Sequence, residues 1–394
     1  MNIMATPPKT INDLLNGVIT IRDQVKDLRE ILLANLVMIG EIPSPTFGEE
    51  ARIRFILDRF TEDGLDRIST DEVGNALAFV RGSEGEKTIL VAAHTDTVFN
   101  SSVDHTVRVE SKRIFGSGVA DNSLGCAAVV SIPKILEHLG IVPKHNLLLM
   151  GITRSLGRGD LAGIRFFLNN CKVPIDYGLF VEGAQLGRLS YSSMGMLRGE
   201  IQCTIPDEYD WTLFESSGAI NILNEVITKI MAIPLPTKPK TTITFGSVNS
   251  GNSYNTVPTT GSLHFEIRSE QAGMVGDLQN RLEEITDEVA SNSQTEVRLE
   301  VIARRRPGGT DFSHPLTKVS KRIQESLGVT PKIQPSVGEL SALIDKEVPG
   351  ITIGITSAYK MHSLKENIAI EPVFSGLAQM VGIIQAMDGG FCDE

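Results

Sequence analysis

The sequence has little of what marks a disulfide-bonded, membrane-spanning or nucleic-acid-binding protein. Only four of its 394 residues are cysteines, and no two of them form a CxxC pair. We expect buried or inert thiols, which suits the reducing cytoplasm. No apolar run approaches the roughly 20 residues of a membrane span, so we expect no membrane partner. The net charge is −11 and no Lys/Arg block occurs, which argues against a nucleic-acid partner.

What the sequence does contain is an ordinary globular composition, with 41% hydrophobic and 22% charged residues. Single hydrophobic cores stop growing at roughly 250–300 residues, so we expect a chain of this length to form two domains. The stretch Met1–Thr10 lacks the apolar core of a signal peptide, which agrees with the expected cytoplasmic location.

The most informative stretch begins at Thr88. Thr88–Ala93 is a short run of β-branched and apolar residues, typical of a buried strand. It ends in His94 and, two residues later, Asp96. Open α/β sheets bind ligands beyond the carboxyl ends of their strands, so this pair indicates a metal site there. His94 is the expected ligand, and Asp96 would hold its other ring nitrogen.

A glycine-rich turn, Ile114–Gly125, follows and would bring the Asp121 carboxylate to the same site. Elsewhere along the chain, strand patterns alternate with helix patterns. The expected strands are Gly74–Val80, Asn146–Ile152, Tyr177–Glu182 and Gly350–Thr356, and the expected helices include Gly125–Leu139 and Pro372–Met387. This alternation predicts an α/β fold with a mostly parallel sheet and helices on both faces.

The pattern changes after Gly195. Residues 197–306 contain strands with alternating polar and apolar side chains together with two helices, as expected of a compact α+β domain. After Pro307 the α/β pattern resumes. We therefore predict a discontinuous main domain, residues 1–196 and 307–394, that is interrupted by an inserted α+β domain, residues 197–306.

Four motifs in this order resemble the co-catalytic zinc exopeptidase and deacylase family, which contains carboxypeptidase G, peptidase T and acetylornithine deacetylase. They are Ala93–Val98, Gly116–Asn122, Phe180–Gly183 and Met361–Glu366. Asn255–Pro258 and Glu266–Arg268 resemble the signature of the family's inserted lid and dimerisation domain. The resemblance runs from about Ile39 to the C-terminus and implies a zinc-metallopeptidase fold.

The resemblance implies a site with two zinc ions about 3.5–4 Å apart that share one carboxylate. By position, Asp121 would be that shared carboxylate. His94 and Glu182 would complete one zinc site, and His362 would serve the other. Histidine nitrogen and carboxylate oxygen form a ligand set that suits zinc.

Two carboxylates of the family pattern are missing. The family places an adjacent Glu-Glu pair after the strand that corresponds to Asn146–Ile152, one as general base and one as zinc ligand. Here Ser155 stands at the base position and Leu156 at the ligand position. A serine hydroxyl is not basic at neutral pH, and leucine cannot bind zinc. Asp160 is the nearest acid, but using it would shift the register of the flanking strand and helix.

Two further positions depart from the family. Relatives carry a lid histidine that stabilises the tetrahedral intermediate, and the corresponding stretch Pro206–Trp211 has none. Ser336–Glu339 stands where relatives place a Ser-Thr-Asp turn beside the pocket. Since the second metal site has lost its own carboxylate, we predict at most one zinc ion per chain.

Two functions stay open. One is a pseudoenzyme, inactive or strongly impaired as a hydrolase, that still binds a metal, a small ligand or a protein. The other is an active metallopeptidase or amidohydrolase with a substitute base, for which Glu339 and Asp160 are the first residues to mutate. The resemblance implies a small peptide or N-acyl amino acid as ligand and a homodimer through the helix at Ala219–Met231. Ile220, Leu223, Ile227 and Met231 form one apolar stripe on that helix, which either pairs with a second copy or packs on the sheet of its own domain. Asn255 and Arg268 would contact that ligand, although turn chemistry and a structural ion pair explain these two residues equally well.

Overall fold

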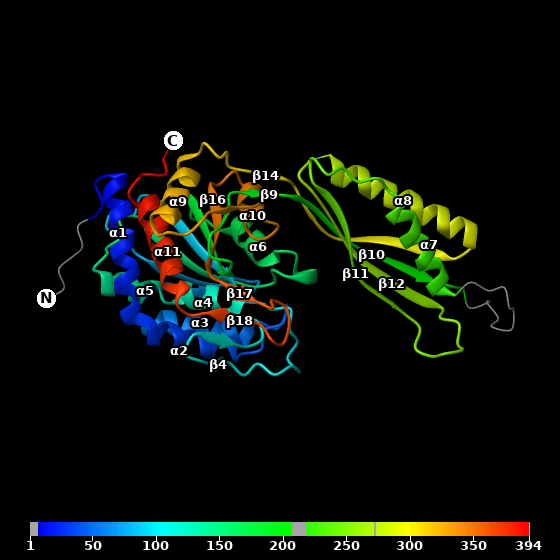
Figure 1. Ribbon diagram of the computed structural model, residues 1–394, viewed down its shortest axis with the longest axis horizontal. Helices are drawn as coiled ribbons and strands as arrows, with labels where there is room; N and C mark the ends of the chain where they lie inside the picture. The colour runs from blue at the N-terminus through cyan, green and yellow to red at the C-terminus, as the bar shows by residue number, and fades with distance from the viewer. Residues whose placement is uncertain (1–6, 207–217, 272, 394) are drawn as a thin grey trace. The chain divides into compact units, whose positions relative to one another are not determined.

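The computed structural model describes residues 7–206, 218–271 and 273–393. The chain forms two compact units. The larger unit comprises Met1–Ser193 and Gly309–Glu394, and the smaller comprises Met194–Gly308. Figure 1 shows the ribbon of both units. Each unit has its own hydrophobic core.

The larger unit is built from helices and strands that alternate along the chain. Its helices are α1 (Ile11–Gln24), α2 (Arg29–Gly40), α3 (Glu50–Glu62), α4 (Leu124–Val130), α5 (Ile132–Leu139), α6 (Ala162–Asn170), α9 (Pro315–Ser326), α10 (Leu340–Ile344) and α11 (Pro372–Asp388). Its main sheet contains β1 (Asp66–Thr70), β2 (Ala76–Val80), β3 (Thr88–His94), β6 (Asn146–Ile152), β7 (Tyr177–Ala184), β8 (Arg188–Ser190), β15 (Lys332–Ile333) and β16 (Gly350–Thr356). A second sheet contains the short strands β4 (Arg108–Val109), β5 (Arg113–Phe115), β17 (Ala358–Tyr359) and β18 (Asn367–Ala369). Two-residue strands near the unit boundary are β9 (Ser192–Ser193) and β14 (Gly308–Gly309).

The strands of the main sheet lie in the order β1-β2-β6-β3-β7-β16-β8-β15. Strand β3 runs parallel to both of its neighbours, β6 and β7, and β7 runs parallel to β16. Among the described strands of the main sheet, the antiparallel pairs are β1 with β2, β2 with β6, and β16 with β8. Because the four central strands are parallel, their carboxyl ends meet at one edge of the sheet.

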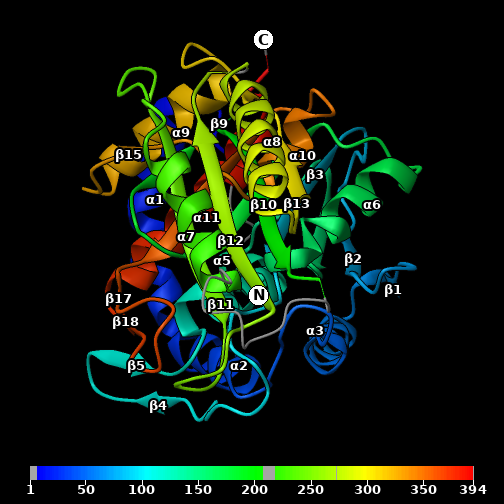
Figure 2. The ribbon, with the colours of Figure 1, turned by 90° about the vertical axis from the view of Figure 1, so that its right-hand side faces the viewer.

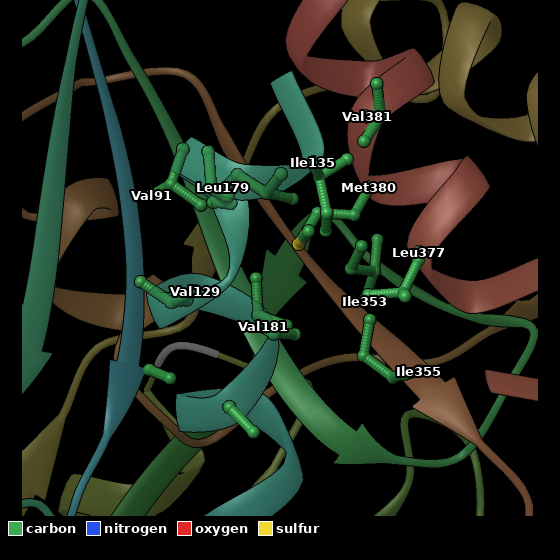
Figure 3. Packing of buried hydrophobic residues seen from close by; sticks show 14 of the residues in the cluster. Val91, Val129, Ile135, Leu179, Val181, Ile353, Ile355, Leu377, Met380 and Val381 are labelled. Carbon is green, nitrogen blue, oxygen red and sulfur yellow. The ribbon is translucent and has the colours of Figure 1, made fainter. Parts of the chain in front are cut away.

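Both faces of the central strands are buried, which explains their nearly continuous apolar sequences. On one face, Val91, Leu179 and Ile353 pack with side chains of α4, α5 and α11 (Figure 3). On the other face, Leu90 and Met150 belong to a separate cluster that includes α6 and α10. A fully buried aliphatic side chain contributes roughly 1.5–3 kcal/mol. A register shift of one residue would exchange the two faces, so packing fixes the position of each strand end.

The structure confirms an α/β fold with a largely parallel central sheet and helices on both faces. The strands expected at Asn146–Ile152 and Gly350–Thr356 are β6 and β16, with the same bounds. The single helix expected over Gly125–Leu139 is wrong, because α4 and α5 are two helices that meet at Ser131. Pro133 in the first turn of α5 has no backbone N–H to donate into α4, which explains the break.

Within the described ranges, no single helix is long and apolar enough to cross a membrane. Two consecutive helical segments, Val119–Val130 and Ile132–Leu139, are together long and apolar enough to cross a membrane, but they meet at a bend of 45°. Every residue of α4 within this pair is buried in the larger unit.

The smaller unit is an antiparallel sheet with two helices on one face. Its strands are β10 (Gly195–Thr204), β11 (Thr241–Ser250), β12 (Thr260–Ser269) and β13 (Glu296–Arg305), in the order β11-β12-β10-β13. Helices α7 (Ala219–Met231) and α8 (Met274–Ser293) lie along the same face of this sheet (Figure 2). Leu197 and Phe265 of the sheet pack with Leu223 and Leu282 of the helices to form the core.

The apolar stripe expected on α7 divides between the inside and the surface. Leu223 is buried in the core of the smaller unit, whereas Ile220 and Met231 are exposed. The buried face of α7 also includes Ile222 and Val226, so it is turned relative to the expected stripe. The homodimer stays a prediction.

The polar face of the smaller sheet carries a linked set of ion pairs. Glu266 accepts hydrogen bonds from Arg198 Nη2 at 2.6 Å and from Arg268 Nε at 2.5 Å. Burial raises the pKa of Glu266, but the hydrogen bonds and charges of the two arginines outweigh it and hold the pKa below its ordinary value. Arg268 therefore has the structural ion pair that was one of its two expected roles.

In the larger unit, a buried asparagine ties β2 to the loop that follows β6. The Asn75 side chain donates to the backbone oxygen of Gly163 at 2.9 Å and to Asp71 Oδ2 at 2.6 Å. Its Oδ1 accepts from Thr153 N at 2.9 Å. Thr153 begins the loop that continues to Ser155, so this network holds one side of the carboxyl edge.

We expect Asn75→Ala to destabilise the larger unit. It would leave the Thr153 N–H and the Gly163 carbonyl without their partner, and an unsatisfied buried group costs roughly 1–3 kcal/mol. Urea denaturation should therefore show a loss of about 2–4 kcal/mol. The control is Asn169→Ala on the exposed side of α6, where we expect a change below about 0.5 kcal/mol. Equal midpoints for the two variants would contradict the proposed importance of the network.

We expect Glu266→Gln to destabilise the smaller unit at pH 7 by roughly 1–2 kcal/mol, because charge-assisted hydrogen bonds are lost. The folded pKa of Glu266 lies below the ordinary value of 4.5, so its contribution is complete above that value. It disappears as the pH falls through the folded pKa. The difference between wild type and variant in denaturant titrations should therefore shrink on acidification. Glu284→Gln, which removes an exposed partner of Arg281, is the control with little effect at either pH.

Candidate metal centre

His94 is the last residue of β3 and lies at the carboxyl edge of the main sheet, where 4% of its surface is exposed. Its Nδ1 lies 3.0 Å from the backbone oxygen of Asp96 and 3.3 Å from Asp96 Oδ1. A backbone oxygen can only accept a hydrogen bond, so Nδ1 carries a proton and donates it to the Asp96 carbonyl, with Asp96 Oδ1 nearby. This leaves Nε2 directed at Asp121 and Glu182. The geometry matches the orienting role expected for Asp96.

Asp121 and Glu182 come from different elements, and Asn122 holds them together. Asp121 lies in the turn before α4, and Glu182 lies near the end of β7. The buried Asn122 side chain bonds the backbone on both sides of Glu182, at 2.9 and 2.7 Å. Gly125 makes this approach possible, because a Cβ there would lie 2.2 Å from Asn122 Oδ1.

The three side chains converge tightly. His94 Nε2 lies 3.0 Å from Asp121 Oδ1 and 3.6 Å from Glu182 Oε2. One possible ligand atom from each residue lies within 4.8 Å of the others, and this is the one such group found among the described residues. One imidazole nitrogen and two carboxylate oxygens fit a divalent ion such as zinc.

The charges of the cluster also fit a cation. Burial lowers the pKa of His94, but hydrogen bonds to Asp121, Asp96 and Glu182 outweigh it and raise the pKa well above its ordinary value. Burial raises the pKa of Asp121, but His362 and His94 outweigh it and hold the pKa well below its ordinary value. A proton on His94 thus partly neutralises the acids around it. A divalent ion would take over that role, since metal ligands bind deprotonated.

His362 approaches the cluster from the other side of Asp121. Its Nε2 lies 2.7 Å from Asp121 Oδ2, and its side chain is 55% exposed. Glu366 positions both residues, because it accepts from His362 N at 2.8 Å and from the Ala120 and Asp121 N–H groups at 2.8 and 3.3 Å. The group of three does not include His362, so within the described chain its cluster partner is Asp121 alone.

The loop at Ser155 and Leu156 is held by its backbone. Asp96 Oδ2 accepts from Ser155 N at 3.1 Å and from Leu156 N at 2.8 Å. It also accepts from Thr46 Oγ1 at 2.8 Å. Ser155 is buried, and within the described ranges its Oγ has no hydrogen-bond partner of good geometry. The backbone N–H groups of Ser155 and Leu156 therefore hold the loop beside Asp96.

Glu339 ends the Ser336–Glu339 turn and is one of the two acids that the sequence offers as a substitute base. It directly precedes α10 and is 5% exposed. Burial raises the pKa of Glu339, while the charge of His94 and the Ser155 hydroxyl lower it and Glu182 raises it. The charges of His94 and Glu182 therefore act on the buried Glu339 carboxyl group.

Arg188 adds a positive charge beside Glu182. Its Nη1 lies 3.6 Å from Glu182 Oε1, and its Nη2 donates to Ser336 Oγ at 3.4 Å. Ser336 lies three residues before Glu339, so Arg188 links the metal-ligand strand to the Ser336–Glu339 turn. Sequence spacing gave no signal for this contact.

Other residues considered from the sequence lie elsewhere. Asp160 forms an ion pair with Arg165 at 2.7 Å, which agrees with discounting it as the base. Asn255 and Arg268 belong to the smaller unit, and their expected contact with a ligand stays a prediction. The lid stretch that lacks a histidine includes residues 207–211, which lie outside the described residues.

The chain is similar to curated proteins and to solved structures. Acetylornithine deacetylase of Yersinia pseudotuberculosis is 22% identical over 319 residues, covering 76% of this chain and 79% of the relative. The dipeptidase Dug1p of Saccharomyces cerevisiae superposes with a TM-score of 0.78 at 14% identity, covering 94% of this chain and 98% of the other.

A second solved structure is described as a dinuclear metal-binding peptidase. It is the YXEP protein of Bacillus subtilis, with a TM-score of 0.64, 13% identity and coverage of 92% of this chain and 99% of the other. The model of peptidase family M20/M25/M40 matches residues 90–386, which include His94, Asp121, Glu182 and His362. Since this match spans most of the chain and the fold agrees, the protein belongs to the M20/M25/M40 family of peptidases and related hydrolases.

Proposed function

We propose that this protein is a metal-dependent hydrolase of amide bonds that works with one tightly bound divalent ion and is slow compared with two-ion relatives. The observation that supports this most directly is the convergence of His94, Asp121 and Glu182 within 4.8 Å. Zinc is the preferred ion, because one imidazole and two carboxylates with room for a further ligand resemble catalytic zinc sites.

Charge balance favours one ion over two. The carboxylates of Asp121 and Glu182 together carry about the charge that neutralises one divalent ion. A second ion near His362 would share Asp121 and would have no carboxylate of its own, because Leu156 stands at that position. Three protein ligands are the usual minimum for a tightly held zinc ion.

The chemistry follows from the ligand set. A divalent ion bound there supplies a Lewis acid for the amide carbonyl. The protein's own part is to fix His94 through Asp96, to hold Glu182 beside Asp121 through Asn122, and to offer a nearby carboxylate to the attacking water. Losing a general base costs typically 10²–10⁴-fold in rate, so the missing glutamate pair makes slow turnover the expectation.

We further propose small peptides or N-acyl amino acids as substrates. Acetylornithine deacetylase and the dipeptidase Dug1p, to which this chain is similar, act on substrates of these two kinds according to their names. A screen of dipeptides and N-acetyl amino acids with the zinc-, manganese- and cobalt-loaded protein tests the proposal. A complete absence of hydrolysis with all three ions would refute it.

A second candidate is a pseudoenzyme that binds the ion and a small ligand without turnover. It is favoured by the simultaneous loss of both acids, with Ser155 and Leu156 in their places. The same screen separates the two, because ligand binding without product formation supports the pseudoenzyme.

We expect about one zinc ion per chain to survive dialysis. His94→Ala should abolish tight binding, because His94 contributes the only imidazole of the three-residue cluster. His362→Ala should leave the ion count nearly unchanged, since its described cluster contact is with Asp121 only. Elemental analysis after dialysis measures both. Two ions per wild-type chain, or loss of the ion in both variants, would contradict the single-site model.

We expect Leu156→Glu to create the second metal site. The new carboxylate would stand at the family's ligand position near His362 and Asp121, raising the dialysis-resistant zinc content toward two ions per chain. Leu156→Gln is the matched control of similar shape without the charge, and it should stay at about one ion. Because Asp96 holds the Leu156 backbone N–H, the loop should keep its position in both variants. An unchanged ion count in Leu156→Glu would show that Leu156 does not occupy the ligand position.

A further inference from the structure

Three polar side chains form one row across the polar face of the smaller sheet. His264 of β12 lies directly opposite Ser247 of β11 on one side and Glu200 of β10 on the other. Ser247 Oγ lies 3.1 Å from His264 Nδ1, and Glu200 Oε1 lies 3.4 Å from His264 Nε2. A hydroxyl, an imidazole and a carboxylate in contact in this order form the arrangement that activates a serine as a nucleophile.

Glu200 determines the role of each ring nitrogen of His264. The Glu200 side chain is 11% exposed, and its Oε1 also accepts a hydrogen bond from Gln202 Nε2 at 3.4 Å. An ionised carboxylate only accepts hydrogen bonds, so His264 Nε2 carries the ring proton and Nδ1 is the acceptor. The Ser247 hydroxyl therefore donates to His264 Nδ1, and the imidazole is in the form that takes up a proton from serine.

A β-bulge brings Ser247 into this row. Phe245 pairs with Phe265 and Ser247 pairs with His264, so Gly246 is an extra residue on β11. Side chains alternate between the two faces of a strand, and without the extra residue Ser247 would lie on the opposite face. Bulges that redirect a side chain in this way are common next to active sites. The contact between Ser247 and His264 thus depends on a local departure from regular pairing.

The position of β11 also offers hydrogen-bond donors near Ser247. It is the outer strand of the smaller sheet, and among the described strands β12 is its one neighbour. Along an outer strand of an antiparallel sheet, alternate backbone N–H groups face away from the neighbouring strand. Backbone N–H groups stabilise the oxygen anion that forms when a serine attacks a carbonyl carbon.

A cavity of about 670 Å³ adjoins the row. Glu200 lines it together with the next row on the same face, which consists of Asn249, Ser262 and Gln202. Residues 256–260 line it as well, and among the described lining residues Glu200 is the only charged one. Amide and hydroxyl groups donate and accept hydrogen bonds without adding charge. The cavity therefore suits a small neutral molecule that is rich in hydroxyl groups.

We propose that Ser247 is the nucleophile of a second catalytic site, which hydrolyses small acyl esters of polyols without a metal ion. Its Oγ bonds to the ester carbonyl carbon while its proton passes to His264 Nδ1, and Glu200 stabilises the imidazolium that forms. The ester carbon–oxygen bond then breaks, and His264 gives the proton to the departing alcohol. A water molecule attacks the acyl-serine by the same route, which releases the carboxylic acid and restores the Ser247 hydroxyl.

The first test is covalent labelling of the full-length protein with diisopropyl fluorophosphate. The Ser247 oxygen displaces fluoride from phosphorus, and peptide mass spectrometry should find one phosphoryl group, on Ser247. His264→Gln should slow labelling by about 10²–10⁴-fold, since it removes the general base. Glu200→Gln should slow it by at least about tenfold, because the tautomer of His264 is no longer fixed. Thr244→Ala is the control, because Thr244 lies on the same strand opposite Glu266, and it should label at the wild-type rate.

The second test measures hydrolysis of glycerol monobutyrate. Ser247→Ala should abolish it, whereas His94→Ala and added chelator should leave it unchanged, because His94 belongs to the larger unit and the row to the smaller. The outcome is therefore independent of the proposed amide hydrolysis at the metal centre. An ester hydrolysis that chelator or His94→Ala removes would assign the turnover to that centre and overturn the proposal.

A third measurement excludes unfolding as the cause of any loss. The His264 side chain is 51% exposed, so urea midpoints of His264→Gln and wild type should agree. Absence of labelling on Ser247 in the wild type, full-rate labelling in His264→Gln, or ester hydrolysis retained in Ser247→Ala would overturn the proposal.

Discussion

The arrangement of the site depends on one buried carboxylate, that of Asp96. One of its oxygens approaches the ring of His94, and the other accepts hydrogen bonds from the Ser155–Leu156 loop and from Thr46. A fully buried carboxylate without such partners would be very costly, so these contacts are obligatory rather than optional. They connect the ends of β3 and β6 and thereby fix His94 and the Ser155–Leu156 loop relative to each other.

Much of the fold and half of the site could be predicted from the sequence, because both depend on short-range patterns. The apolar runs of β6 and β16 are bounded by polar or turn residues, so their ends are visible in the sequence. His94 and Glu182 stand near the ends of such strands, and parallel strands bring those ends together. The break between α4 and α5 is also encoded locally, in Pro133, although periodicity alone passes over it.

The resemblance placed the Ser336–Glu339 turn beside the pocket, but the contact that holds this turn could not be predicted from the sequence. Arg188 holds the turn through Ser336 Oγ. This contact joins residues 148 positions apart, which no periodic pattern reveals. The offset of the buried face on α7 has a similar origin, because packing against the small sheet decides which residues turn inward.

The Ser155–Leu156 loop is held in a way that does not depend on its side chains. The loop at Ser155 and Leu156 is anchored by backbone N–H groups, which every residue except proline provides. Side chains at these two positions can therefore change without releasing the loop from Asp96. The proposed single-ion model makes the electrostatic balance less tolerant, because two fewer carboxylates leave less negative charge for a second divalent ion. On that model, sequence change at this loop alters metal number and proton transfer before it affects the α/β fold.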